Sequence, residues 1–172
     1  MVLGILALAA LAGVVVWGWS RGADQGSRVT IAVLPFENLS RNSDSDYLAD
    51  GFAEDTIVSL GRLDPGRVSV VGRTSMIAYK RTTKSLAEIG REVGAEYIVE
   101  GSFRVESSQL RVTARLIRAR DQIQVWSDSY DKDASSMLSV QQELSWAIAQ
   151  QVHTRLPPDR QRAIARRQTQ NA

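Results

Sequence analysis

Residues 96–130 read EYIVEGSFRVESSQLRVTARLIRARDQIQVWSDSY, and this stretch decides the fold. It contains three segments in which apolar and polar residues alternate: 96–106, 109–118 and 122–130. Alternation with a period of two is typical of strands that bury one face. The connectors between these segments are only two or three residues long, so consecutive segments must turn back on each other. The sequence therefore predicts an antiparallel, three-stranded meander.

The sequence before the meander predicts two parallel strands joined through a helix. Residues 28–36 (RVTIAVLPF) are short and nearly all apolar, as expected for a strand buried on both faces. Turn-forming residues follow in 37–45, which we interpret as a loop. Residues 46–63 have the apolar spacing of a helix, with one face formed by Leu48, Phe52, Leu60 and Leu63. Residues 68–71 form a second short strand. A strand–helix–strand unit crosses over with a right hand, which makes its strands parallel.

Three more helical segments complete the predicted fold. Residues 74–79 form a brief helical turn. The capping box of Ser85 and Glu88 opens a helix that ends at Gly94. The last helix runs from about residue 135 to 156, with an inward face formed by Leu138, Leu144, Ile148 and Val152. The predicted class is α/β, with a five-stranded mixed sheet packed against helices in the order strand, helix, strand, helix, three strands, helix.

The N-terminal residues predict a membrane anchor. Residues 2–20 (VLGILALAALAGVVVWGWS) carry no charge, and about 20 helical residues span the ~30 Å hydrocarbon core of a bilayer. Trp17 and Trp19 precede the first charge, Arg21, where an interfacial aromatic belt falls. We expect a transmembrane anchor in 1–21, a linker in 22–27, one domain in 28–157 and a basic polar tail or linker in 158–172. The alternative is a cleaved signal peptide.

Composition excludes several kinds of site. The 172 residues carry a net charge of +2, contain no cysteine and include one histidine, His153. Thiol chemistry and disulfides are impossible, and a triad or metal site built on histidines is not expected. The near balance of charge gives no electrostatic support for direct nucleic-acid contact. We therefore expect no enzymatic activity, no metal and no cofactor.

Six blocks in the chain occur in a recognisable order: IAVLPFENLS (31–40), DYLADGFAEDTI (46–57), VVGRTSMIAYK (70–80), EIGREVGAEYIVEGSFR (88–104), LRVTARLI (110–117) and VWSDSYDKD (125–133). Together they resemble the TolB amino-terminal-like domain of bacterial membrane-anchored signalling proteins, which is related to the flagellar outer-membrane FlgO module. Two local departures from that family are Thr56, where members usually carry an aliphatic residue, and the hairpin 119–122, which lacks the usual glycine.

The resemblance implies a non-catalytic, periplasmic sensory or interaction module on a single-pass inner-membrane protein. In that family a winged-helix DNA-binding, cyclase or kinase output domain commonly precedes the membrane helix, and tetratricopeptide repeats follow the domain. The chain is then a fragment of such a protein or a domain that stands alone. The flagellar relative offers an alternative, a cell-envelope assembly component with a cleaved signal peptide.

Two places are candidate contact sites. Arg73, Thr74 and Ser75 lie where a strand meets a helical turn, and could hold an anion or a peptide carboxylate. The simpler interpretation is that Thr74 or Ser75 caps the turn while Arg73 pairs with a local carboxylate. Trp146 falls off the inward face of the last helix and predicts a surface for a protein partner or an adjacent repeat domain. Association with a second copy of the chain also stays open.

Acidic residues gather on the first helix. Asp46, Asp50 and Glu54 share one face at a spacing of four residues, which we interpret as a solvated face near the positive end of the helix dipole. Glu37 and Asn38 follow the first strand and could join them at the carboxyl edge of the sheet, where ligands of α/β folds tend to bind.

Overall fold

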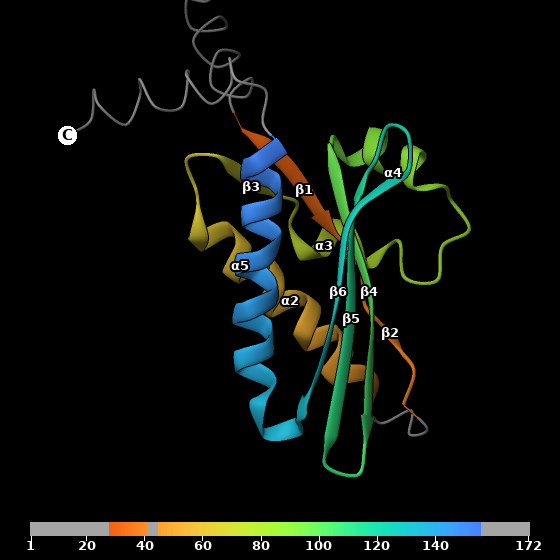
Figure 1. The fold of residues 1–172 in the computed structure, drawn as a ribbon. Coiled ribbons are helices and arrows are strands. Elements are labelled where there is room, and N and C mark those ends of the chain that lie inside the picture. The colour runs from red at the N-terminus through yellow and green to blue at the C-terminus, as the bar shows by residue number, and fades with distance from the viewer. Residues whose placement is uncertain (1–27, 41–44, 156–172) are drawn as a thin grey trace, which may run out of the picture.

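The computed structural model describes residues 28–40 and 45–155, which form one mixed sheet with helices on both faces (Figure 1). The strands are β1 (Val29–Val33), β2 (Glu37–Asn38), β3 (Val68–Val70), β4 (Tyr97–Glu106), β5 (Gln109–Arg118) and β6 (Ile123–Asp133). The helices are α2 (Asp46–Leu63), α3 (Arg73–Ile77), α4 (Leu86–Val93), the 3-10 turn η2 (Ala134–Ser136) and α5 (Met137–Arg155). The predicted anchor in 1–21 and the tail from 158 lie outside the described residues.

The sheet joins a parallel part to an antiparallel part. Its order is β3-β1-β4-β5-β6, with β1 parallel to both β3 and β4. Strands β4, β5 and β6 form the predicted antiparallel meander. The α/β class and the mixed sheet are thereby confirmed. Within the described ranges, no helix has both the length and the apolar character needed to cross a bilayer.

The predicted count of five strands is wrong, because the sheet has six. The missed strand is β2, which lies in the segment that we interpreted as a loop and pairs in parallel with β4. Strand β1 ends at Val33, two residues before Pro35. The chain nevertheless continues beside β4, and the Leu39 N–H donates a hydrogen bond to the Phe103 carbonyl at 2.8 Å. A pair of two residues carries no periodicity from which a strand could be predicted.

The main core lies between one face of the sheet and helices α2 and α5 (Figure 1). Three aromatic rings pack together in it, with the Phe36 and Phe52 centroids 5.3 Å apart and the Phe52 and Phe103 centroids 5.9 Å apart. Two inward predictions for this core are wrong. Leu63 is exposed, and on α5 the buried position near the N-terminus belongs to Val140, whereas Leu138 is 64% exposed.

The second face of the sheet is covered only at one end. Met76 of α3 and Ile89 of α4 are buried there against Ala32, Ile98 and Ala119. Gly90 allows this close packing, since a Cβ on it would stand 2.5 Å from the Ala119 Cβ. Farther along β4, β5 and β6 this face carries polar side chains instead of a helix layer.

The two ends of the described domain meet at one corner. The Val29 N–H, at the start of β1, donates to the Arg67 carbonyl at 2.8 Å. The Arg67 guanidinium Nη1 in turn lies 3.5 Å from His153 Nδ1, close to the end of α5. Entry into the sheet and exit from the last helix are therefore adjacent in space (Figure 1).

Candidate functional site

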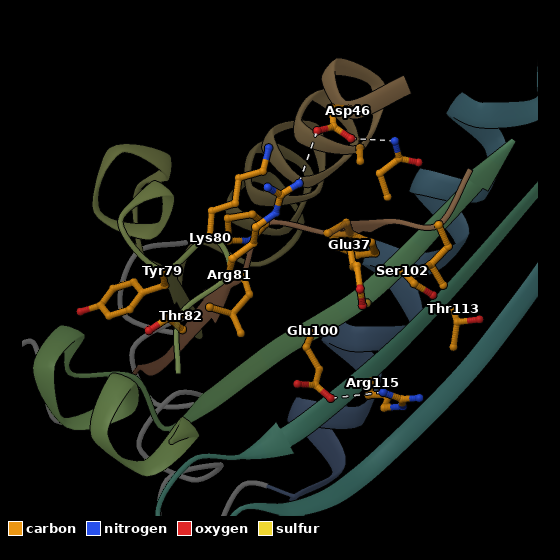
Figure 2. A pocket seen from close by; sticks show the side chains of 17 residues that line it. Glu37, Asp46, Tyr79, Lys80, Arg81, Thr82, Glu100, Ser102, Thr113 and Arg115 are labelled. Carbon is orange, nitrogen blue, oxygen red and sulfur yellow. Dashed lines mark hydrogen bonds and ion pairs between the residues drawn. The ribbon is translucent and has the colours of Figure 1, made fainter. Parts of the chain in front are cut away.

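A cavity of about 640 Å³ opens where β1 gives way to β2 (Figure 2). Residues 34–36 form its floor and residues 37–39 one wall. The first turn of α2 and segment 79–82 form the sides, and the exposed face of β4 and β5 continues the cavity outward. We call this cavity the β2 groove. It contains Glu37, Asn38 and Asp46, which sequence reasoning had placed together at the carboxyl edge of the sheet.

A glycine shapes the floor of the β2 groove. A Cβ on Gly101 would lie 2.4 Å from the Phe36 Cε1 and 2.4 Å from the Thr113 carbonyl oxygen. Only glycine therefore lets the Phe36 ring sit directly on β4. The ring fills the space that a side chain would otherwise occupy, and it fixes the path of the segment that carries Glu37.

The acidic face of α2 is paired and not merely solvated. Asp46 accepts a hydrogen bond from Asn38 Nδ2 at 2.7 Å, and its other oxygen lies 3.9 Å from an Arg81 nitrogen. Lys80 donates to both carboxylate oxygens of Asp50 at 2.8 Å. Each of these contacts ties the rim of the β2 groove to α2. Among the described residues, no group of three or more His, Asp or Glu side chains could hold a metal ion.

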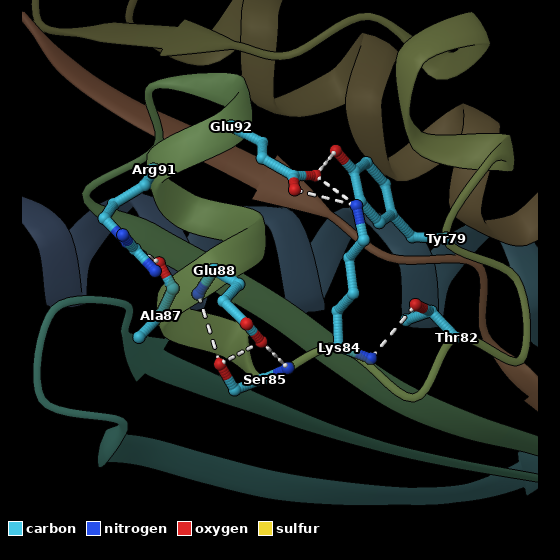
Figure 3. Close-up of polar contacts among 8 residues, drawn as sticks. All are labelled: Tyr79, Thr82, Lys84, Ser85, Ala87, Glu88, Arg91 and Glu92. Atoms are coloured by element: carbon cyan, nitrogen blue, oxygen red, sulfur yellow. Dashed lines mark hydrogen bonds and ion pairs between the residues drawn. The ribbon is translucent and has the colours of Figure 1, made fainter.

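The rim segment is also fixed to α4 (Figure 3). Glu92 accepts a hydrogen bond from the Tyr79 hydroxyl at 2.8 Å and from Lys84 Nζ at 2.7 and 2.8 Å. The hydrogen bonds from Lys84 and Tyr79 lower the pKa of the Glu92 carboxyl, and the same bonds raise the pKa of Tyr79 and of Lys84. The positions of residues 79–84 are thereby set from both ends.

Two guanidinium groups on the groove lining keep unused donors. Arg81 has a φ of 57°, and its side chain is 85% exposed. Arg115 donates one hydrogen bond, from Nη1 to Glu100 Oε1 at 3.3 Å, and half of its side chain is exposed. Figure 2 shows Arg81 on the rim segment and Arg115 on the sheet face. Both can bind an additional anionic group.

The open face beside the groove is a polar surface built from cross-strand pairs. Arg111 of β5 pairs with Asp131 of β6, and the Thr113 and Ser129 hydroxyls are 3.1 Å apart. Arg104 of β4 stands directly opposite Arg111 in the register. This surface suits a polar partner and offers no apolar patch for a further helix.

Comparison with known proteins agrees with this architecture. Residues 27–147 match the sequence model of the family described as "HilA/YgeH-like transcriptional regulator, second domain". The chain belongs to this family. Family membership makes the described domain a regulator domain, in agreement with the predicted link to bacterial signalling proteins.

One relative of this HilA/YgeH-like domain is a much longer protein. A protein of Rhizobium meliloti (strain 1021) named "Putative adenylate cyclase 3" is 32% identical over 130 residues, which are 76% of this chain and 22% of that protein. Among solved structures, TolB from Acinetobacter baumannii has a TM-score of 0.54 at 19% identity, over 73% of this chain and 28% of TolB. The likeness to TolB concerns the fold, which confirms that the fold is TolB-like.

A third similar protein is a lipoprotein. The structure of GNA1162 from Neisseria meningitidis matches 73% of this chain and 99% of its own, at 14% identity and a TM-score of 0.49.

The predicted anion site of this HilA/YgeH-like domain lies apart from the groove. Arg73 begins α3, and its Nε lies 3.2 Å from a Glu54 carboxylate oxygen. Gly72 is the N-cap residue, so neither Thr74 nor Ser75 caps the helix by its side chain. Thr74 and Ser75 are exposed on the first turn of α3. Anion or peptide binding by Arg73, Thr74 and Ser75 stays a prediction.

Trp146 lies on the surface of α5, with 60% of its area exposed. The sequence prediction that it points away from the core is confirmed, and its use as a partner surface stays a prediction. Thr56, the departure from the aliphatic family pattern, is fully buried. Its hydroxyl donates to the Phe52 carbonyl at 2.7 Å, which satisfies the buried polar group.

Sequence reasoning missed the cationic half of the β2 groove. From sequence alone, Arg81 and Thr82 belong to a polar basic loop in 81–84, and Arg115 is one of the polar residues that alternate with apolar ones in 109–118. Their grouping depends on how the loop folds against α2 and α4. One signal was available. The basic residues in 80–84 are opposite in charge to the acidic residues in the first half of helix 46–63, which could have predicted that the two segments pair.

Proposed function

We propose that this domain is the non-catalytic interaction module of a bacterial regulatory protein. Residues 1–21 anchor it in the inner membrane, and the described domain lies on the periplasmic side. The observation that carries the proposal is the match of residues 27–147 to the second domain of HilA/YgeH-like transcriptional regulators. A module of this kind passes a binding event to an output domain elsewhere in the protein.

The chemistry of the β2 groove favours binding over catalysis. Two of its carboxylates, Asp46 and Glu100, already accept hydrogen bonds from Asn38 and Arg115. The third, Glu37, is exposed to solvent, whereas enzymes tune a general acid or base by burial and by neighbouring groups. Paired side chains around an open groove suit recognition of a polar ligand.

Signal transfer follows from a preference of the ligand for one state. A partner that binds one conformation or one oligomer of the domain more tightly shifts the population toward it. The single N-terminal helix then carries this change to the output side of the membrane. The relative named as a cyclase, of which the chain spans 22%, supports an arrangement in which this module serves a separate output domain.

The location is tested with introduced thiols, because the chain contains no cysteine. In spheroplasts, a membrane-impermeant maleimide should label Ser127→Cys, which is exposed on β6. The control Val2→Cys should be labelled only after the membrane is permeabilised. Labelling of Val2→Cys alone in sealed spheroplasts would place the domain in the cytoplasm and refute the proposal.

Coupling is tested by joining the chain to a DNA-binding domain that activates a reporter only as a dimer. Under the proposal, variants of the described domain change reporter output while the amount of membrane-bound protein stays constant. Output that depends only on the membrane segment would show that the domain passes no signal.

The likeness to the TolB fold favours one alternative, an envelope assembly component with a cleaved signal peptide. Intact-mass spectrometry separates the two candidates. A mature protein that retains Trp17 and Trp19 supports the anchored regulator, and a mass that begins after them supports the exported component.

A further inference from the structure

We infer that the β2 groove binds an extended peptide segment of a partner protein through one acidic side chain. The inference rests on the proposed interaction function and assigns it a site. It is based on the free N–H donors of the two arginines that line the groove, and on the backbone conformation of Arg81.

The first step concerns which groups remain free to bind. Asp46 and Glu100 already accept hydrogen bonds from Asn38 and Arg115, respectively. Arg81 comes no closer than 3.9 Å to a carboxylate of the described residues, beyond hydrogen-bond distance. Arg115 uses one of its five N–H donors. Arg81 and Arg115 have free donors, whereas Asp46 and Glu100 are occupied and Glu37 is the one remaining carboxylate among the described residues of the lining, so the complementary ligand group is a single carboxylate.

The second step concerns Arg81. Its φ of 57° lies in the left-handed region, which costs a non-glycine residue roughly 1–2 kcal/mol. The contacts of Tyr79 and Lys84 with Glu92 and of Lys80 with Asp50 hold the flanking residues in place. The 3.9 Å contact of Arg81 with Asp46 is exposed, so it stabilises the fold too little to offset this cost. The Thr82 N–H donates to the Tyr79 carbonyl at 3.2 Å, so the left-handed residue closes a turn that holds Arg81 on the rim of the groove.

The third step concerns the form of the ligand. The floor of the groove is apolar where Leu34, Pro35 and Phe36 line it, and the groove runs without a wall onto the polar face of β4 and β5. A small molecule would be poorly enclosed there. An extended segment can instead place an apolar residue on the floor, an acidic residue at the Arg81 guanidinium group and the rest of its length on the open face beside Arg115.

Glu37 sets a limit on the ligand. It is exposed on the same lining, and its carboxylate repels additional negative charge. A segment with one acidic residue among apolar neighbours is therefore preferred over a strongly acidic one. Replacing Glu37 with glutamine removes the repulsion and leaves the size of the side chain unchanged.

The test is an NMR titration of the ¹⁵N-labelled full chain in detergent micelles with three probes. These are the blocked pentapeptide Ala-Val-Glu-Val-Ala, its Gln counterpart, and glutarate. We expect the Glu peptide to shift the amides of residues 79–82 and 113–115, with affinity at least about fivefold above the Gln peptide. Equal shifts with both peptides, or none at these amides, would overturn the inference. Glutarate binding as tightly as the peptide would overturn the peptide assignment.

Three variants assign the contact. Arg81→Gly relieves the left-handed strain and removes the charge, so it should fold at least as stably and yet bind the Glu peptide roughly fivefold more weakly. Glu37→Gln should bind it about twofold more tightly. The control Arg104→Ala removes an exposed charge from the same sheet face outside the groove and should leave binding unchanged. Equal losses in Arg81→Gly and Arg104→Ala would reduce the effect to general electrostatics and refute the site.

The outcome also separates this inference from the proposed function. A chain that couples to the reporter but ignores the Glu peptide retains its function and loses this site. A chain whose groove binds the peptide while reporter output never responds to the domain keeps the site and contradicts the regulatory role.

Discussion

Replacing Gly90 of α4 with alanine should destabilise the domain, although helix propensity predicts the opposite. In an exposed helix interior, alanine is worth about 1 kcal/mol more than glycine. Gly90, however, is buried against the turn between β5 and β6. The new Cβ would lie 2.5 Å from the Ala119 Cβ and 3.0 Å from the Ala95 carbonyl oxygen. Carbon atoms in good contact are about 3.5–4.0 Å apart, so α4 must move away by roughly 1 Å.

The magnitude follows from the two opposing terms. Overpacking in a close-packed core typically costs about 1–3 kcal/mol, and the propensity gain recovers at most about 1 kcal/mol. We therefore expect Gly90→Ala to lower the free energy of unfolding by up to about 2 kcal/mol. Urea denaturation followed by circular dichroism measures this difference directly.

A matched control is available on α2. Gly61 also lies inside a helix, but nothing stands within 4 Å of a Cβ built on it. Gly61→Ala should raise the free energy of unfolding by about 0.5–1 kcal/mol, so the two glycine-to-alanine changes differ in sign. Adding Ala119→Gly to Gly90→Ala should recover part of the loss, because it removes the nearest atom. If Gly90→Ala were as stabilising as Gly61→Ala, the close helix–sheet contact would be refuted.

Three further predictions concern the sheet. Gly101→Ala should lower the free energy of unfolding by about 2 kcal/mol or more, since its Cβ would collide with both the Phe36 ring and the Thr113 backbone oxygen. A thermal midpoint equal to that of the unmodified chain would contradict the packing of the groove floor. Gln122→Gly should raise the free energy of unfolding by up to about 1 kcal/mol, because Gln122 has a φ of 57°, which glycine adopts without strain. A loss of stability would contradict that conformation. Burial raises the pKa of Tyr130 to about 12, so its contribution to stability is complete below pH 10 and is lost as pH rises toward 12. Ultraviolet titration should show a late-titrating tyrosine, besides Tyr79, that Tyr130→Phe removes; an unchanged curve would contradict the burial.

Local signals predicted most of the secondary structure. Helix α2 has the predicted bounds, and the capping box of Ser85 and Glu88 and the left-handed Gly94 delimit α4 as expected. The meander followed from alternation and short connectors. These features depend on residues that are close in sequence, so their periodicity and end signals can be recognised without the structure.

Features that depend on tertiary contacts were not predictable. Helix α5 has apolar residues on several sides, so spacing alone did not distinguish Leu138, which is exposed, from Val140, which is buried. Strand β2 exists because β4 offers it backbone partners. The sequence indicated the acidic side of the β2 groove, at Glu37, Asn38 and Asp46. Its cationic side appears only when the loop with Arg81 folds against α2 and α4.

The corner where β1 begins and α5 ends brings the two ends of the described domain together. Since Val29 and His153 both contact Arg67, the chain enters and leaves the fold at nearly the same point. A unit of this kind can be spliced into an unrelated polypeptide without stretching either junction or disturbing its core. The inserted domain would retain the β2 groove and the polar face of the meander. One recognition surface could in this way be reused under different output domains during evolution.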